Sequence, residues 1–216
     1  KPDLGAQRSG WRTVASYDYV RADGTVAGAV QRRTARFDRG MEKEFVQRSW
    51  NPARGAWEKT GFDKIPYRLP QVLEAIADAD RVIYIVEGEK DVDRLHSLGF
   101  VATCNIEGAA KPSQKPKWRN EYTEQLAGAA RVVLIPDNDP PGRAHMAAIA
   151  QALRGKVTDL RWLELPGLPE KGDVSDWLDA GHTADELRAL VEQAPVPGQD
   201  ADPSVEIIAN KKKTPA

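Results

Sequence analysis

Cysteine and histidine are scarce in this chain, and long apolar runs are missing from it. Cys104 is the single cysteine and there are three histidines. A disulfide within the chain is therefore excluded, and no Cys/His cluster has the spacing of a zinc site. We expect a reducing, cytoplasmic location. No apolar run approaches the roughly 18 residues of a membrane-spanning helix, and no signal-peptide pattern is found, so neither membrane insertion nor secretion is expected.

The composition that remains is typical of a globular protein, with 41% hydrophobic and 29% charged residues among 216. This length allows one sizeable domain or two small ones. The net charge of -1 is unevenly distributed, because residues 1–80 carry a net +3 and residues 81–194 a net -4. A basic half beside an acidic half suits a polyanion and a divalent cation. Many two-domain proteins share such an imbalance, so it does not identify a function by itself.

Residues 81–194 alternate between apolar β-rich runs and helical patterns. The predicted strands are residues 82–86, 100–104, 131–136 and 157–166. A last helix is predicted over residues 182–194, with Thr183 as its N-cap. Four such alternations indicate a three-layer α/β domain with a mainly parallel four-stranded sheet.

The flanking regions have a different character. Residues 1–80 are predicted to form a small mixed α/β subdomain, with a hairpin turn at Asp23-Gly24 and a helix over residues 71–79. Residues 195–216 have the composition of a disordered tail.

Acidic side chains follow three of the predicted strands. Glu87 comes directly after the first strand, Asp137 and Asp139 follow the third, and Asp173 comes one loop after the fourth. Because the carboxyl ends of parallel strands meet at one edge of a sheet, these clusters should converge there. Oxygen ligands gathered in this way suit Mg²⁺ or Mn²⁺. Any one of these acids, taken alone, is more often an exposed loop residue or a helix cap.

The segments IVEGEKDVDRL and LIPDNDPPGR, about fifty residues apart, resemble the Toprim domain of bacterial-type primases, topoisomerases and some nucleases. On this resemblance Glu87, Asp137 and Asp139 match the motif acids. KGDVSDWLDAG is similar to the third acidic motif of phage and plasmid primases, which indicates Asp173 and Asp176. YDYVRADG and PYRLPQVLEA resemble the subdomain that precedes Toprim in those primases.

The resemblance implies the catalytic core of a DNA primase that makes primers from NTPs on single-stranded DNA. The sequence departs from the pattern of these primases in two features: a zinc-binding module ahead of this region and a G-x-x-x-x-G-K-[ST] helicase loop after it are not found. We expect a zinc-binding module and a replicative helicase to be supplied elsewhere. A Toprim nuclease and a non-catalytic nucleic-acid-binding replication module remain as alternatives.

The resemblance also suggests roles for single residues. Asp137, Asp139 and Asp173 are expected to bind the metal, and Glu87 to be a further ligand or a catalytic base. The candidates for nucleotide binding are Lys90, Arg143, Lys64 and Arg68. For Lys90 and Arg143 the alternative is a salt bridge to the neighbouring acids. The candidates for DNA binding, which lie among aromatic residues, are Arg32, Arg33, Arg36, Lys43 and Arg48.

Some residues are predicted to have structural roles only. His96 and His145 lack partners nearby in the sequence and are predicted to lie on the surface. Trp118 is left open between core packing and base stacking. The residues predicted to lie in the core are Cys104, Trp162 and Trp177.

Overall fold

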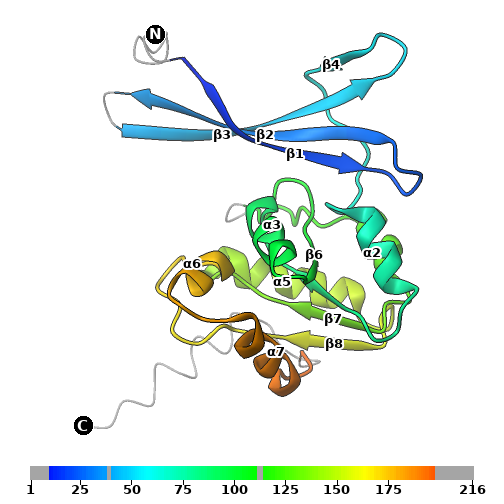
Figure 1. The fold of residues 1–216 in the computed structure, drawn as a ribbon, viewed down its shortest axis with the longest axis vertical. Helices are drawn as coiled ribbons and strands as arrows, with labels where there is room; N and C mark the ends of the chain where they lie inside the picture. Colours follow the sequence, from blue (N-terminus) through cyan, green and yellow to red (C-terminus); the bar gives the residue numbers. More distant parts are fainter. Residues whose placement is uncertain (1–9, 38–39, 111–113, 198–216) are drawn as a thin grey trace.

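A computed structural model of the chain describes residues 10–37, 40–110 and 114–197, which form two sheets, one above the other (Figure 1). The first is a four-stranded antiparallel sheet in the order β1-β2-β3-β4. Its strands are β1 (Arg12–Val20), β2 (Val26–Phe37), β3 (Gly40–Asn51) and β4 (Ala56–Glu58). The predicted turn joins β1 to β2, where Gly24 has a φ of 84° and the Thr25 N–H donates to Asp23 Oδ1.

The second sheet is parallel throughout, in the order β6-β5-β7-β8. Its strands are β5 (Val82–Ile85), β6 (Val101–Thr103), β7 (Arg131–Leu134) and β8 (Asp159–Trp162). The helices are α2 (Leu69–Ile76), α3 (Glu89–Ser97), α4 (Asn120–Leu126), α5 (Pro140–Leu153), α6 (Val174–Asp179) and α7 (Ala184–Gln193). Thr183 caps α7, as predicted.

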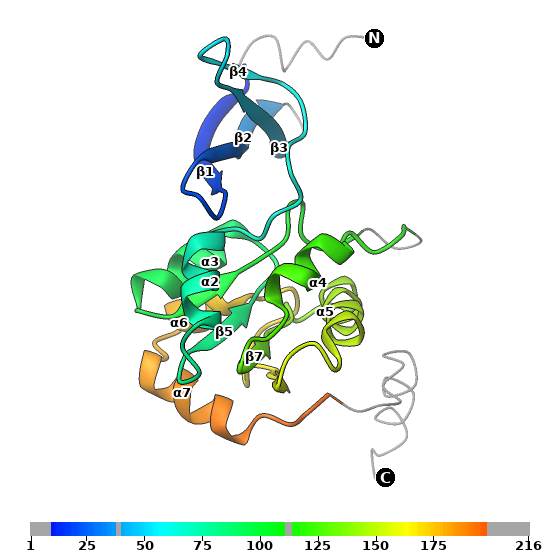
Figure 2. The ribbon, with the colours of Figure 1, turned by 90° about the vertical axis from the view of Figure 1, so that its right-hand side faces the viewer.

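Helices cover both faces of the parallel sheet. Tyr84 and Val133 belong to a buried cluster with residues of α3, α6 and α7. Ile83 and Val132 belong to a second cluster with residues of α2, α4 and α5. The strands therefore form the middle layer (Figure 2), and the predicted α/β fold class with a four-stranded parallel sheet is confirmed.

Two helices differ from the sequence expectation. The helix predicted over residues 71–79 forms as α2, but it packs against the parallel sheet, because Val72 and Ala75 enter the second cluster. Helix α6 was not predicted. It lies within the third acidic motif, KGDVSDWLDAG, with Asp173 as its N-cap.

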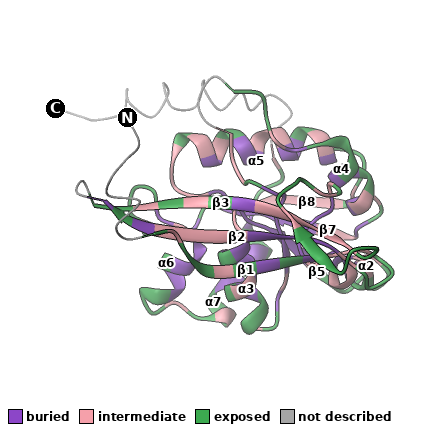
Figure 3. Cartoon of the chain, turned by 90° about the horizontal axis from the view of Figure 1, so that it is seen from above, coloured by how far each residue is buried: buried purple, intermediate pink, exposed green. Residues whose placement is uncertain are grey.

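Aromatic side chains pack the antiparallel sheet against the segment that leads from β4 to α2. Tyr19 packs against Phe62 and Tyr67, with ring centroids 5.2 and 5.1 Å away. A Cβ on Gly28 would overlap the Phe62 ring, so the glycine permits this close packing. From above, residues of intermediate exposure follow one another along β2 and β3 (Figure 3).

No helix in the described part of the chain is long and apolar enough to cross a membrane. The predicted tail falls mostly outside the described residues, except for residues 195–197. Of these, Pro195 accepts a hydrogen bond from the Trp162 N–H.

Candidate functional site

Two acidic segments, residues 87–91 after β5 and residues 137–139 after β7, lie side by side at the centre of the parallel sheet. Ile85 of β5 pairs with Leu134 of β7, and these are the last residues of the two strands. Glu87 follows two residues later on one strand and Asp137 three residues later on the other. The register therefore brings both carboxyls to the carboxyl edge of the sheet, as the sequence predicted.

Glu87 is only partly exposed, and its Oε1 atom is buried without a hydrogen-bond partner among the described residues. Burial, followed by the negative charge of Asp139, raises its pKa to about 7, while a backbone hydrogen bond from Asp137 opposes the rise. A Cβ on Gly142 would overlap Glu87 Oε1 and would lie 2.9 Å from the Asp137 carbonyl oxygen. Gly142 thus lets the first turn of α5 approach the carboxyl.

The Asp137 carboxyl is in a similar environment. Burial raises its pKa to about 8, and Glu87, Asp91, Asp173 and Asp139 each raise it further. Keeping two such carboxyls ionised together requires a compensating positive charge.

Asp139 has a structural role as well. It is the N-cap of α5, where its Oδ1 accepts the Gly142 N–H at 2.8 Å. A side-chain cap of this kind fixes the direction of the helix and of the preceding turn.

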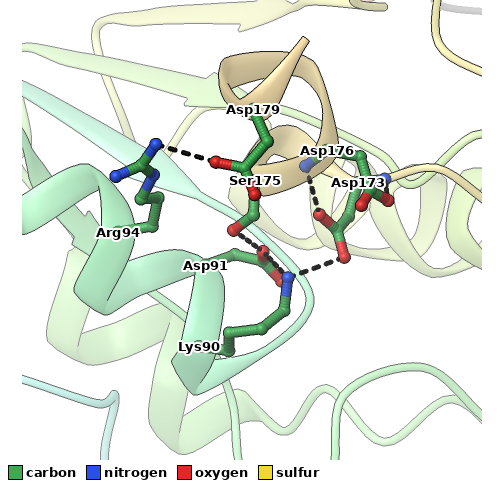
Figure 4. Close-up of polar contacts among 7 residues, drawn as sticks. All are labelled: Lys90, Asp91, Arg94, Asp173, Ser175, Asp176 and Asp179. Carbon is green, nitrogen blue, oxygen red and sulfur yellow. Dashed lines mark hydrogen bonds and ion pairs between the residues drawn. The ribbon is translucent and has the colours of Figure 1, made fainter.

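Asp173 lies across from the start of α3 and is paired on both of its oxygens. Its Oδ1 accepts the Asp176 N–H at 3.0 Å, and Asp176 Oδ2 in turn accepts the Asp173 N–H at 3.1 Å. Its Oδ2 accepts from Lys90 Nζ at 2.9 Å, and Lys90 also pairs with Asp91 Oδ1 at 2.8 Å (Figure 4). Burial tends to raise the pKa of Asp173, but these hydrogen bonds and the lysine charge hold it below its usual value.

Asn138, between the two aspartates, was missed by the sequence analysis. Its side-chain Nδ2 donates to the carbonyl oxygens of Leu168 (2.8 Å) and Pro169 (2.9 Å). Its backbone N–H donates to Gly172 O, and its carbonyl oxygen accepts the Lys171 N–H. Asn138 therefore joins the second acidic segment to the loop that leads to Asp173.

Arg143 contributes to the same arrangement. Its guanidinium donates to Asn138 Oδ1 and pairs with Glu164 at 3.1 Å. Lys90 and Arg143 therefore both form salt bridges to nearby acids in this structure. The sequence analysis gave such salt bridges as the alternative to nucleotide binding.

The other two nucleotide-binding candidates lie on the segment that enters α2. Arg68 makes two hydrogen bonds to Asp93 Oδ1, at 3.0 and 2.8 Å, and its backbone has a φ of 59°. The side chain of Lys64 is of intermediate exposure, and its carbonyl oxygen accepts from Gln125.

The predicted DNA-binding residues divide between the two faces of the antiparallel sheet. Arg32 pairs with Phe45 and Thr34 with Lys43, on the face that carries Tyr17 and Tyr19. Arg33 and Arg48 lie on the opposite face, where Arg33 pairs with Glu44 at 2.9 Å and Arg48 donates to Gln31.

The Arg32 face is directed towards the acidic edge. Gln47, on that face, donates to Glu107, and a Cβ on the next residue, Gly108, would lie 2.9 Å from the Glu87 carbonyl oxygen. The C-terminal end of β2 and the N-terminal end of β3 extend over the side of the parallel sheet that carries α3 and α6 (Figure 1).

His145 was predicted to lie on the surface, and this prediction is wrong. Its side chain is buried, its Nε2 lies 2.9 Å from Asn105 Oδ1, and burial lowers its pKa to about 4. Asn105 also donates to the carbonyl oxygens of Ile106 and Gly108. His145 therefore supports the loop that lies against Glu87.

The remaining structural predictions have clear outcomes. His96 is exposed, and Cys104 and Trp177 are buried as predicted. Trp162 is only partly buried. Trp118 packs in the core against Tyr122 and donates its indole N–H to Thr123.

Within residues 10–37, 40–110 and 114–197, no three His, Cys, Asp or Glu side chains are close enough together to form a ready-made metal site. The acids at the sheet edge act on one another electrostatically, but they do not enclose a common point.

Comparisons with known proteins find the fold but no sequence relative. No family model matches the chain, and no curated protein matches it. The Aquifex aeolicus primase, zinc-binding and RNA polymerase domains, aligns with a TM-score of 0.58 and 18% identity over 83% of this chain and 40% of that one. The RNA polymerase domain of Mycobacterium tuberculosis primase DnaG aligns with a TM-score of 0.54 and 20% identity, over 84% of this chain and 55% of that one. The chain thus has the fold of primase RNA polymerase domains and spans about half of their length.

Proposed function

We propose that the chain is the catalytic core of a DNA primase of the phage or plasmid type, which synthesises short primers from NTPs on single-stranded DNA. The observation that carries this proposal is a pair of partly buried carboxyls, Glu87 and Asp137, that have no ion pair with a cation among the described residues and lie at the edge of a sheet with a primase-like fold. The resemblance to Toprim primases implies that Mg²⁺ or Mn²⁺ would be required.

The donor chemistry at this edge fits a hard divalent cation. Carboxylate oxygens are the ligands that Mg²⁺ and Mn²⁺ prefer, and Glu87 Oε1 has no other partner among the described residues. Glu87, Asp137 and Asp139 would hold the ion after their side chains rearrange, with Asp173 as the further ligand that the resemblance implies. The ion would stabilise the negative charge that develops on the phosphoryl oxygens during nucleotidyl transfer.

The side chains around the ion would divide the remaining work. Glu87 either completes the ligand set or takes the proton from the attacking 3′-hydroxyl. Arg143 and Lys90 stand near enough to the acids to contact a triphosphate once their present partners are exchanged, and Lys64 and Arg68 lie on the entering segment. Arg32 and Lys43, on the face towards the acids, are the best placed of the basic residues to contact template phosphates.

The test is to incubate the chain with single-stranded DNA, labelled NTPs and Mn²⁺, and to separate the products on a denaturing gel. Products of two or more nucleotides support the proposal, and Asp137→Asn should abolish them. Asp179→Asn, which removes an exposed acid of α6, is the matched control and should keep activity. Shortened DNA would indicate a Toprim nuclease, and unchanged DNA and NTPs a binding module.

A zinc-binding module and a replicative helicase are proposed partners. The Aquifex primase structure includes zinc-binding domains beside its RNA polymerase domain. If such a module selects the template, adding one in trans should raise primer yield on some template sequences more than on others.

A further inference from the structure

The acids at the sheet edge fall into two groups that differ in their partners. Glu87 Oε1 is buried without a partner among the described residues. Asp91 and Asp173, by contrast, share the ammonium group of Lys90, at 2.8 and 2.9 Å. One part of the acidic edge is therefore without a counter-ion, and the other part already has one.

Lys90 reaches its two partners from the first turn of α3. Asp91 is the next residue on that helix, with a side chain only 6% exposed, and its Oδ1 also accepts the Ser175 hydroxyl at 2.6 Å. Asp173 caps α6, 83 residues further along the chain. Figure 4 shows the lysine extended between the two helices, with both carboxylates directed towards its nitrogen.

The remaining oxygen of Asp173 is also occupied. It accepts the Asp176 N–H and so holds the N-terminus of α6. Coordination of a metal by Asp173 would have to displace either the lysine or the helix cap. Leaving Asp91 without any cation would be unfavourable, because a buried ionised carboxylate needs a compensating positive charge.

We propose that Lys90 is a built-in cation that takes the place of a second divalent ion between Asp91 and Asp173. Two-metal sites are common in enzymes that transfer nucleotides, and their two ions are held by shared carboxylates. Here a compact ammonium charge, fixed to the first turn of α3, lies between Asp91 and Asp173 and offsets one of their two negative charges. The inference rests on the proposed function for its chemistry. It limits the chain to one dissolved ion, at Glu87, Asp137 and Asp139, and it takes Asp173 out of the ligand set of that ion and Lys90 out of the residues that would contact the triphosphate.

The experiment counts bound Mn²⁺ by calorimetric titration of the wild-type chain and of Lys90→Met. The variant keeps the length of the side chain but leaves Asp91 and Asp173 without their cation. We expect one more ion per chain in Lys90→Met than in the wild type. Asp173→Asn added to Lys90→Met should remove that extra ion, and asparagine still caps α6.

Two further variants separate the charge from the position. Lys90→Arg keeps a cation and should bind the same number of ions as the wild type. Arg94→Met is the matched control, because Arg94 also joins α3 to α6, through Asp179 at 2.9 Å, but outside the acidic group (Figure 4). It should gain no ion. Thermal unfolding identifies any variant that does not fold, and Lys90→Gln then replaces Lys90→Met.

The two proposals fail separately in this titration. The difference between Lys90→Met and the wild type decides the role of Lys90, and equal numbers of ions would overturn it. The wild-type number decides the metal site of the proposed function. A wild type that binds no Mn²⁺ contradicts that site, whatever Lys90→Met does.

Discussion

Tyr19 and Glu89 are joined by a buried hydrogen bond, in which the tyrosine hydroxyl donates to Glu89 Oε1 at 2.8 Å. Tyr19 belongs to β1 and Glu89 begins α3, two residues after Glu87. The bond therefore connects the antiparallel sheet to the segment that carries the first acid of the site. Burial raises the pKa of Glu89, and the hydrogen bond from Tyr19 opposes the rise.

Tyr19→Phe should lower the free energy of unfolding by about 1–3 kcal/mol at neutral pH, because it leaves a buried carboxylate without its donor. The loss should shrink as the pH falls towards 4, since a protonated Glu89 no longer needs that donor. Tyr67→Phe is the matched control. Its hydroxyl donates to Asp93, which keeps two hydrogen bonds from Arg68, so the loss should be smaller. Urea unfolding across this pH range measures both variants, and equal losses would contradict the role of Tyr19.

Asp137→Asn should stabilise the metal-free protein at pH 8. A carboxyl whose pKa rises from about 4 to about 8 on folding keeps a proton that the unfolded chain has released. The free energy of unfolding therefore falls as the pH rises through this window. We expect the variant to be more stable by about 2 kcal/mol at pH 8, because partial exposure of the side chain reduces the effect, and equal to the wild type near pH 4.

Urea unfolding between pH 4 and pH 8, with a chelator present, tests this expectation. Added Mn²⁺ should stabilise the wild type and leave the variant unchanged. A variant that is less stable than the wild type at pH 8 would show that the Asp137 carboxylate is compensated in the metal-free protein.

The arrangement of the parallel sheet could be predicted because its cause is local in the sequence. Apolar runs such as residues 82–86 and 131–136 alternate with helical patterns, and acids that follow such strands must meet at one edge. Helix α6 was missed because it has six residues and begins inside the segment that was interpreted only as an acidic motif. Its capping pair, Asp173 and Asp176, was visible in the sequence, three residues apart.

His145 and Asn138 show where the sequence analysis fell short. His145 lies on the same helical face as Met146, Ile149 and Leu153, all of which are buried, so helical periodicity could have predicted its burial. Its partner Asn105 could not have been predicted, because the contact depends on how α5 packs beside the loop after β6. The two carbonyl oxygens that accept from the Asn138 amide are likewise backbone atoms of a loop about 30 residues away, which carry no sequence signal.

Arg32 and Arg33 should differ in their effect on DNA binding, although they are adjacent. Neighbouring residues of a strand point to opposite faces, and Arg32 is on the face that is directed towards the acidic edge. Arg33 is already paired with Glu44.

Arg32→Gln should weaken single-stranded DNA binding and reduce the slope of log K against log salt concentration by about one. Arg33→Gln should change both quantities less. Fluorescence anisotropy at several salt concentrations measures them, and equal effects would contradict a single binding face.

Asn138→Ala should loosen the loop over residues 167–172 without unfolding the sheet. The variant loses the two donors to Leu168 and Pro169, which costs about 1–2 kcal/mol of unfolding free energy. The backbone bond from the Lys171 N–H to Asn138 O can still form, but it has less support. Amide exchange at Lys171 should therefore speed up about tenfold, the equivalent of about 1.4 kcal/mol in the opening equilibrium.

Asn51→Ala, which removes an amide that donates to Glu58 on the distant hairpin, is the control. It should leave exchange in this loop unchanged. An unchanged rate in Asn138→Ala would mean that the backbone pairing alone holds the loop, and that the amide of Asn138 does not help to position Asp173.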